Sequence, residues 1–131
     1  MATILIADDD PIVRDIAGEM LRATAHAAVL AEDGVEVLRL LDVVAVDLLI
    51  TDMLMPNMDG GEVILAAREK YPDLKILAIS GGGAVGVDLM LRTARAFGAD
   101  ATLTKPLQIA TFIRTVDQLL QSRPLLRSVA S

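Results

Sequence analysis

A length of 131 residues with 53% hydrophobic side chains fits one compact domain with a full core, and it leaves no length for a second domain. The absence of cysteine excludes disulfides, thiol catalysis and thiolate metal sites, so oxygen atoms are the main ligands available to a metal ion. The net charge of −6 argues against general binding of nucleic acid, and no apolar run reaches the ~18 residues needed to cross a bilayer, so we expect a cytoplasmic protein.

Apolar runs of strand length alternate with stretches of helical period, which is typical of an α/β fold with a doubly wound parallel sheet. A first strand is predicted at residues 3–7, followed by a helix capped by Asp10. This helix is predicted to bury one apolar stripe, made of Ile12, Ile16, Ala17, Met20 and Leu21. A second, weakly marked strand is predicted at residues 27–31, and Asp33 and Glu36 then have the spacing of a capping box.

Three further strands are predicted at residues 47–51, 75–79 and 101–103. Between the first two of these, Asp59 is predicted to cap a third helix, which ends before Pro72. Five strands alternating with five helices give a series of right-handed βα units.

The last two helices carry different signals. The fourth follows the flexible turn Gly81-Gly82-Gly83 and is predicted to end before Gly98. The fifth has the cleanest apolar stripe in the chain, made of Ile109, Phe112, Ile113, Val116, Leu119 and Leu120. Pro124 limits this helix, so we expect the folded domain to span residues 1–121 and residues 122–131 to form a frayed tail.

Each chemically suggestive side chain follows the end of a predicted strand. Asp8 and Asp9 follow the first strand, Asp52 the third, Ser80 the fourth and Lys105 the fifth. Because sites in doubly wound sheets form beyond the carboxyl ends of the strands, we expect these side chains to lie close together. Carboxylates gathered at one edge repel one another unless a cation joins them.

Taken singly, these residues have ordinary explanations. Ser80 can be a turn residue, Lys105 a solvated surface lysine, and Asp52 a side chain that bonds the amides of its own turn. Taken together, they supply a carboxylate nucleophile, a site for a divalent cation, a hydroxyl donor and a mobile cation, as phosphoryl chemistry requires. Mg²⁺ suits such a site because it prefers hard oxygen ligands.

Four motifs stand in order along the chain: Ile4-Leu5-Ile6-Ala7-Asp8-Asp9-Asp10, Thr51-Asp52-Met53-Leu54-Met55-Pro56-Asn57-Met58-Asp59-Gly60, Ser80 after the fourth strand, and Lys105-Pro106 after the fifth. In this order they resemble the response-regulator receiver domains of two-component signalling, over about residues 3–121. The resemblance implies a flavodoxin-like sheet with strand order 2-1-3-4-5 and five helices. It also implies a stand-alone signalling module that is no enzyme beyond its own phosphoryl transfer and dephosphorylation.

The resemblance further implies that Asp52 accepts a phosphoryl group from a phosphohistidine on a sensor histidine kinase or phosphotransfer protein. By the same resemblance, Asp9, Asp52 and the carbonyl of Leu54 bind Mg²⁺ directly, and Asp8 helps through water. These four residues form the metal site that the family pattern predicts.

Ser80 would then be the switch hydroxyl and Lys105 the charged partner of the phosphoryl group, with a cis peptide bond between Lys105 and Pro106. The chain departs from the family at Thr102, where members often carry an aromatic residue whose inward rotation reports phosphorylation. We therefore hypothesise that the signal uses the glycines at 81–83 and a shift of the fourth helix.

Charge is distributed unevenly along the chain. Residues 1–74 hold 15 acids and 5 bases, whereas residues 75–131 hold 3 acids and 7 bases. We expect a downstream protein partner on the basic face that includes Arg92, Arg95 and Arg114; the alternative is that these arginines only keep their helices solvated. A monomer that pairs transiently is the expected state.

Two rival functions remain open. A small phosphatase of the haloacid-dehalogenase type would use Asp8 as nucleophile and Asp10 as acid, but the late acidic pair of such enzymes is replaced here by Thr104-Lys105-Pro106. A degenerate receiver would take no phosphoryl group and would serve only as a docking module.

Overall fold

Five strands and five helices alternate along the chain in the computed structural model, which describes residues 1–81 and 86–121. The strands pair in parallel in the order β2-β1-β3-β4-β5, which confirms the predicted fold and strand order. In chain order the elements are β1 (Thr3–Ala7), α1 (Pro11–Arg22), β2 (Ala27–Ala31), α2 (Gly34–Val43), β3 (Leu48–Asp52), α3 (Gly60–Lys70), β4 (Lys75–Ser80), α4 (Val87–Phe97), β5 (Ala101–Thr104) and α5 (Ile109–Gln121).

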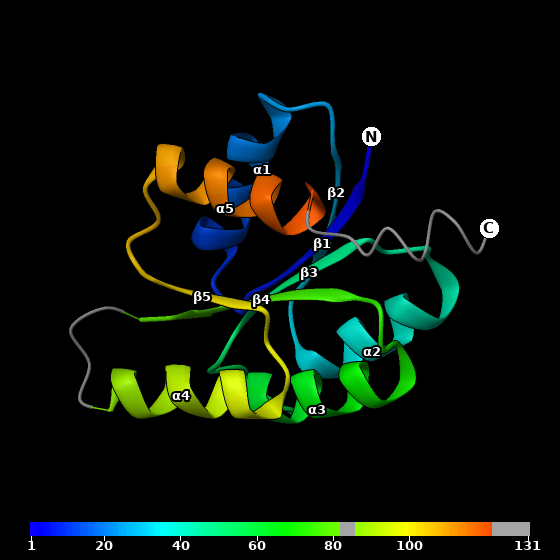
Figure 1. Cartoon of the computed structure of the whole chain (residues 1–131), viewed down its shortest axis with the longest axis vertical. Helices are drawn as coiled ribbons and strands as arrows, with labels where there is room; N and C mark the ends of the chain where they lie inside the picture. Colours follow the sequence, from blue (N-terminus) through cyan, green and yellow to red (C-terminus); the bar gives the residue numbers. More distant parts are fainter. Residues whose placement is uncertain (82–85, 122–131) are drawn as a thin grey trace.

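The helices form two layers, one on each face of the sheet. α1 and α5 lie on one face, and α2, α3 and α4 lie on the other (Figure 1). Because side chains alternate along a strand, each buried strand contributes to both layers. Leu49 and Ile76 belong to the core beneath α2 and α3, whereas Ile50 and Leu77 belong to the core beneath α5. The central strands β1, β3 and β4 are buried on both faces, as their apolar runs predict.

Three of the predicted helix caps are formed. Asp10, Asp33 and Asp59 each accept a hydrogen bond from a backbone N–H two or three residues further along, at 2.8 to 2.9 Å. One detail differs from the predicted capping box, because the carboxylate of Glu36 accepts from the backbone N–H of Glu32 and not from that of the cap residue. The caps fix where α1, α2 and α3 begin.

The apolar stripes of α1 and α5 are only partly buried. Ala17 and Leu21 are buried as predicted, but Ile12, Ile16 and Ile109 are 67%, 46% and 56% exposed. The prediction for these three isoleucines was wrong. Ile12 and Ile109 lie in the first turns of α1 and α5, and Ile16 borders a hollow beside Lys105, so none of the three is fully covered by other segments.

Helix α4 begins after Gly86, whose φ of 88° suits glycine, and it stops at Gly98, whose φ is 123°. Gly82, Gly83, Pro124 and the tail at 122–131, on which the sequence made predictions, lie outside the described residues. No helix within residues 1–81 and 86–121 is long and apolar enough to cross a membrane.

Candidate functional site

Three carboxylates gather at the carboxyl edge of the sheet, which is the edge where the strands end. β1 and β3 are neighbours, with Ala7 opposite Thr51, so Asp8 and Asp52 emerge side by side. One carboxylate oxygen from each of Asp8, Asp9 and Asp52 lies within 4.8 Å of the others. Asp8 and Asp52 are only 2% and 6% exposed, and Asp9 is exposed. We call these three residues the acidic cluster.

Lys105 joins the acidic cluster from the end of β5. Its Nζ lies 2.8 Å from Oδ2 of Asp8 and 3.2 Å from Oδ2 of Asp52. The peptide bond between Lys105 and Pro106 is cis, as the resemblance implied. The sheet therefore brings residues from three distant segments into contact, and the ammonium group of Lys105 pairs with two of the three carboxylates.

Burial and neighbouring charges both shift the pKa values of Asp52 and Lys105. Burial, followed by the negative charge of Asp8, raises the pKa of Asp52 above its ordinary value, and Lys105 offsets only part of this effect. For Lys105, burial would lower the pKa, but hydrogen bonds and charges from Asp8 and Asp52 outweigh burial and raise it. The carboxylates thus favour an additional cation beside them.

The donor set fits a divalent metal ion. Clustered carboxylate oxygens are the ligands that Mg²⁺ prefers, and two of the three side chains are held in place by burial. The backbone N–H of Leu54 lies 3.4 Å from Oδ1 of Asp52, so the loop after β3 folds back over that carboxylate. The part of Leu54 as a carbonyl ligand stays a prediction.

Gly60 closes the loop that follows Asp52. A side chain at this position would place Cβ 2.2 Å from the carbonyl oxygen of Asp52 and 2.6 Å from Cα of Met53, so only glycine fits. Its backbone N–H also donates to the carbonyl of Met53, at 3.0 Å. The sequence analysis named Gly60 in a motif but gave it no role, although its place at the end of the loop, directly after the cap Asp59, was the available signal.

Ser80 connects the site to α4. It is 1% exposed at the end of β4, and its carbonyl oxygen accepts a hydrogen bond from the backbone N–H of Lys105 at 2.8 Å. Its hydroxyl donates to Sδ of Met90, on α4, at 3.4 Å. Sequence reasoning missed Met90 because a methionine at helical spacing reads as ordinary core.

Thr102 occupies the position where receiver domains often carry an aromatic residue. Nη2 of Arg95 donates to its Oγ1 at 2.9 Å, so α4 is also tied to β5. The side chain of Thr102 is thus a hydrogen-bond partner of the helix and offers no ring that could rotate inward.

An apolar hollow lies beside Lys105. It has a volume of 400 Å³ and is lined by Val13, Ile16, Gly81, Lys105, Pro106 and Leu107. The exposed face of Ile16 on α1 forms one wall, and the loop after β5 forms another. The hollow places an apolar surface next to Lys105, the partner of the acidic cluster.

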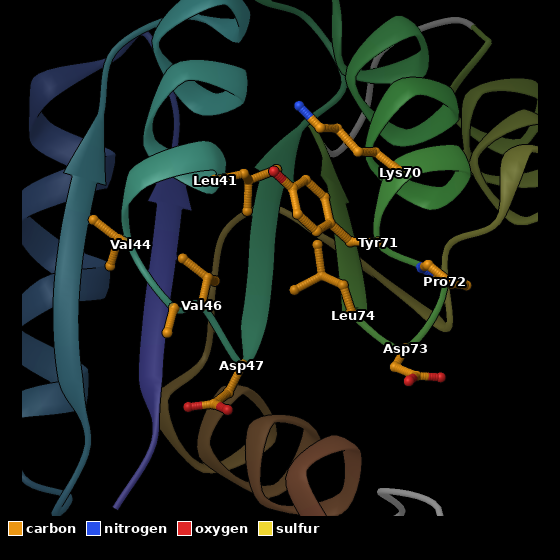
Figure 2. Close-up of a pocket in the computed structure, with 10 residues that line it drawn as sticks. Leu41, Val44, Val46, Asp47, Lys70, Tyr71, Pro72, Asp73 and Leu74 are labelled. Carbon is orange, nitrogen blue, oxygen red and sulfur yellow. The ribbon is translucent and has the colours of Figure 1, made fainter. Parts of the chain in front are cut away.

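A second hollow lies at the opposite, amino edge of the sheet, between α2 and α3 (Figure 2). It has a volume of 360 Å³, and its lining includes Leu41, Tyr71 and Leu74. Nearby, Asp42 accepts hydrogen bonds from Nζ of Lys70, at 2.6 Å, and from the hydroxyl of Tyr71. The hydrogen bond from Lys70, then that from Tyr71, lowers the pKa of Asp42.

Arg68 ties several segments together near this edge. Its guanidinium donates twice to the carbonyl of Gly98, at 3.2 and 2.7 Å, and once to the carbonyl of Leu74, at 2.6 Å. It also pairs with Asp100 at 2.9 Å. The carboxyl end of α4 is therefore fastened to α3.

Comparison with known proteins gives consistent results. The family profile described as response regulator receiver domain matches residues 4–117. Transcriptional regulatory protein GlrR of Escherichia coli (strain K12) is 32% identical over 124 residues, which are 94% of this chain and 27% of GlrR. Response regulator MprA of Mycobacterium ulcerans (strain Agy99) is 33% identical over 122 residues, which are 93% of this chain and 51% of MprA. The chain thus spans about a quarter of GlrR and about half of MprA.

A solved structure agrees with the sequence relatives. Chemotaxis response regulator CheY4 of Vibrio cholerae matches with a TM-score of 0.82 and 28% identity, over 92% of this chain and 99% of CheY4. Receiver domains are signalling modules of two-component systems that work with histidine kinases, and they are not classical enzymes. The acidic cluster is suited to Mg²⁺ and to an aspartyl phosphate. The chain belongs to the response regulator receiver domain family.

Proposed function

We propose that Asp52 accepts a phosphoryl group from a phosphohistidine on a sensor histidine kinase or phosphotransfer protein, within a receiver domain that spans residues 1–121. The observation that carries this proposal is the contact of Lys105 with both Asp8 and Asp52 at the acidic cluster. Asp52 sits at the end of a buried strand, where its carboxylate is held in a fixed position.

In the proposed step, a carboxylate oxygen of Asp52 attacks the phosphorus atom of the phosphohistidine. A new P–O bond forms as the P–N bond breaks, and the electron pair of that bond leaves with the histidine nitrogen. An ionised carboxylate needs no general base. The ammonium group of Lys105 moves from Asp52 to an oxygen of the arriving phosphoryl group and neutralises part of its charge.

Asp8, Asp9, Asp52 and the carbonyl of Leu54 would hold Mg²⁺. When bound, the ion would neutralise the carboxylates and stabilise the oxygens of the transferring group. The hydroxyl of Ser80 would donate to a phosphoryl oxygen and so report the modification to α4.

The surface around the site supports docking of a protein donor. Ile16 exposes apolar surface in the 400 Å³ hollow next to Lys105, and Ile12 and Ile109 are exposed in the first turns of α1 and α5. A phosphohistidine on a partner protein has to reach the buried carboxylate of Asp52 across this surface. The isoleucines would exclude water from the contact and position the donor.

The downstream partner would bind elsewhere. Arg92 and Arg95 are exposed on α4, and Arg114 is exposed on α5. These two helices precede and follow β5, which is the outermost strand on that side of the sheet. Reversing all three charges is expected to remove binding of an acidic protein partner and to leave phosphorylation of Asp52 intact.

A labelling experiment tests the function. The protein is incubated with Mg²⁺ and acetyl phosphate, and mass spectrometry locates the base-labile phosphoryl adduct. We expect the adduct on Asp52, its loss in Asp52→Asn, and its retention in the matched control Asp42→Asn at the other edge. An adduct on Asp8 would support the phosphatase, and the lack of any adduct would support a docking module.

A further inference from the structure

The buried hydroxyl of Ser80 has a weak acceptor. A buried hydroxyl requires a hydrogen-bond partner, and here it donates to the thioether of Met90 at 3.4 Å. Thioether sulfur is a poor acceptor compared with oxygen. The contact therefore holds Ser80 in place while leaving its hydroxyl available to a better partner.

The stronger acceptor would be an oxygen of a phosphoryl group on Asp52, which lies on the side of Ser80 away from α4. In the sheet, Asp52 lies opposite Ile79, so Ser80 is one residue beyond the position that pairs with Asp52. The carbonyl of Ser80 is bonded to the backbone of Lys105, which contacts Asp52 through its side chain. Ser80 thus lies between the acidic cluster and α4, and hydrogen bonds to a charged phosphoryl oxygen are stronger than those to a neutral group.

The position of Met90 allows the loss of its hydrogen bond with Ser80 to affect α4. It lies in the first half of α4, and its half-buried side chain packs against the core beneath α2, α3 and α4. The other tie of α4 to the strands, from Arg95 to Thr102, lies further along the helix. A change at Ser80 therefore acts first on the amino half of α4.

We propose that Met90 is a positioning residue that holds the Ser80 hydroxyl away from Asp52 in the unphosphorylated protein, and that a phosphoryl group on Asp52 competes with the Met90 sulfur for this hydroxyl. The proposal rests on the proposed function, because it needs a phosphoryl group on Asp52. Met90 then reports the modification to α4, which Thr102 cannot do in the manner of an aromatic residue.

The competition predicts that removing the sulfur favours the modified form. Met90→Leu keeps nearly the same volume and hydrophobicity but lacks the acceptor. Since the contact is a weak neutral hydrogen bond, we expect beryllofluoride, an analogue of the phosphoryl group, to bind Met90→Leu about twofold to fivefold more tightly in the presence of Mg²⁺.

A double-mutant cycle tests this. Beryllofluoride affinity is measured by fluorine NMR for the wild type, Met90→Leu, Ser80→Ala and the double variant, with Met20→Leu on α1 as the matched control. We expect tighter binding for Met90→Leu, no further effect of that change in the Ser80→Ala background, and no effect of Met20→Leu. An equal gain in both backgrounds, or no gain in either, would overturn the proposal.

A second measurement needs no variant. The methyl resonance of Met90 in the wild-type protein is expected to shift when beryllofluoride binds, while that of Met20 stays in place. Beryllofluoride binding without a shift at Met90 would overturn the part assigned to Met90 and leave the proposed function standing. If the wild-type protein bound no beryllofluoride, that result would contradict the proposed function, and with it the proposed competition for the Ser80 hydroxyl.

Discussion

The two edges of the sheet use acidic side chains in opposite ways. At the amino edge, Asp42 is exposed and accepts hydrogen bonds from Lys70 and Tyr71, and its pKa is lowered. At the carboxyl edge, Asp52 is buried beside Asp8, and its pKa is raised despite Lys105. The same residue type is stabilised as an anion at one edge and destabilised at the other.

The difference separates residues that support the fold from those that serve the site. A carboxylate with a raised pKa costs stability when it is ionised, and the buried core of β1, β3 and β4 has to offset that cost. Such a carboxylate is also stabilised by any cation that binds beside it. Burial and repulsion in the acidic cluster thus favour the binding of Mg²⁺, and the cations at the site must then neutralise the charge of the phosphoryl group.

The largest effect should come from removing Lys105, with removal of Lys70 at the other edge as the comparison. Lys105→Met leaves two buried carboxylates without their counter-ion, so we expect a loss of about 1–3 kcal/mol in the free energy of unfolding without metal. Lys70→Met removes the exposed ion pair with Asp42, and we expect little change in the free energy of unfolding. Urea denaturation in the presence of a chelator measures both variants. Equal stabilities of the two variants would show that the acidic cluster is solvated and not strained.

Adding Mg²⁺ should increase the difference between variants of the acidic cluster and variants of the amino edge. A ligand that binds only the folded protein stabilises it by about 1.4 kcal/mol at ten times its Kd. We expect this gain in the wild type and in Asp42→Asn, and a much smaller gain in Asp9→Asn and Asp52→Asn. Urea midpoints recorded over a range of Mg²⁺ concentrations provide the measurement. A full gain in Asp52→Asn would place the ion elsewhere.

The smallest effect concerns pH. Because the folded pKa of Asp52 is raised, its contribution to stability is present below the ordinary value of 3.8 and is lost as the pH rises through the folded pKa. Asp52→Asn should therefore gain stability over the wild type as the pH rises, in metal-free buffer. The pKa of Asp42 is lowered, so its contribution is present above 3.8 and is lost as the pH falls through the folded value.

The matched pair Asp42→Asn and Asp52→Asn checks this sign. Stability differences from the wild type, measured by urea unfolding between about pH 3 and pH 7, should have opposite signs at neutral pH. Parallel curves for the two variants would contradict the assigned pKa shifts.

Local signals in the sequence predicted most of the fold. Asp10, Asp33 and Asp59 cap their helices because a cap depends only on the next few residues. The end of β1 was predicted correctly, and the ends of β3, β4 and β5 were each predicted one residue too early, because the polar residues Asp52, Ser80 and Thr104 still belong to their strands. The acidic cluster and Lys105 follow from those ends once the strand order is known.

Features that depend on contacts between distant segments were not predictable. The helical period marks the apolar side of α1 and α5 but not which residues of that side another segment covers, so the exposure of Ile12, Ile16 and Ile109 was missed. The need for glycine at 60 arises from the close approach of the β3 backbone. The acceptor of Ser80 lies on α4, in a separate segment of the chain.

The attachment of α4 by Arg68 has a mechanical consequence. Since its carboxyl end is fastened at Gly98, a tilt of the helix about that end moves its amino half most. Met90 lies seven residues before Phe97, the last residue of α4, or about 10 Å from that end, so a tilt of about 10° displaces Met90 by about 2 Å. A small rotation is enough to break its 3.4 Å contact with Ser80, and the amino end of α4 sweeps the widest arc.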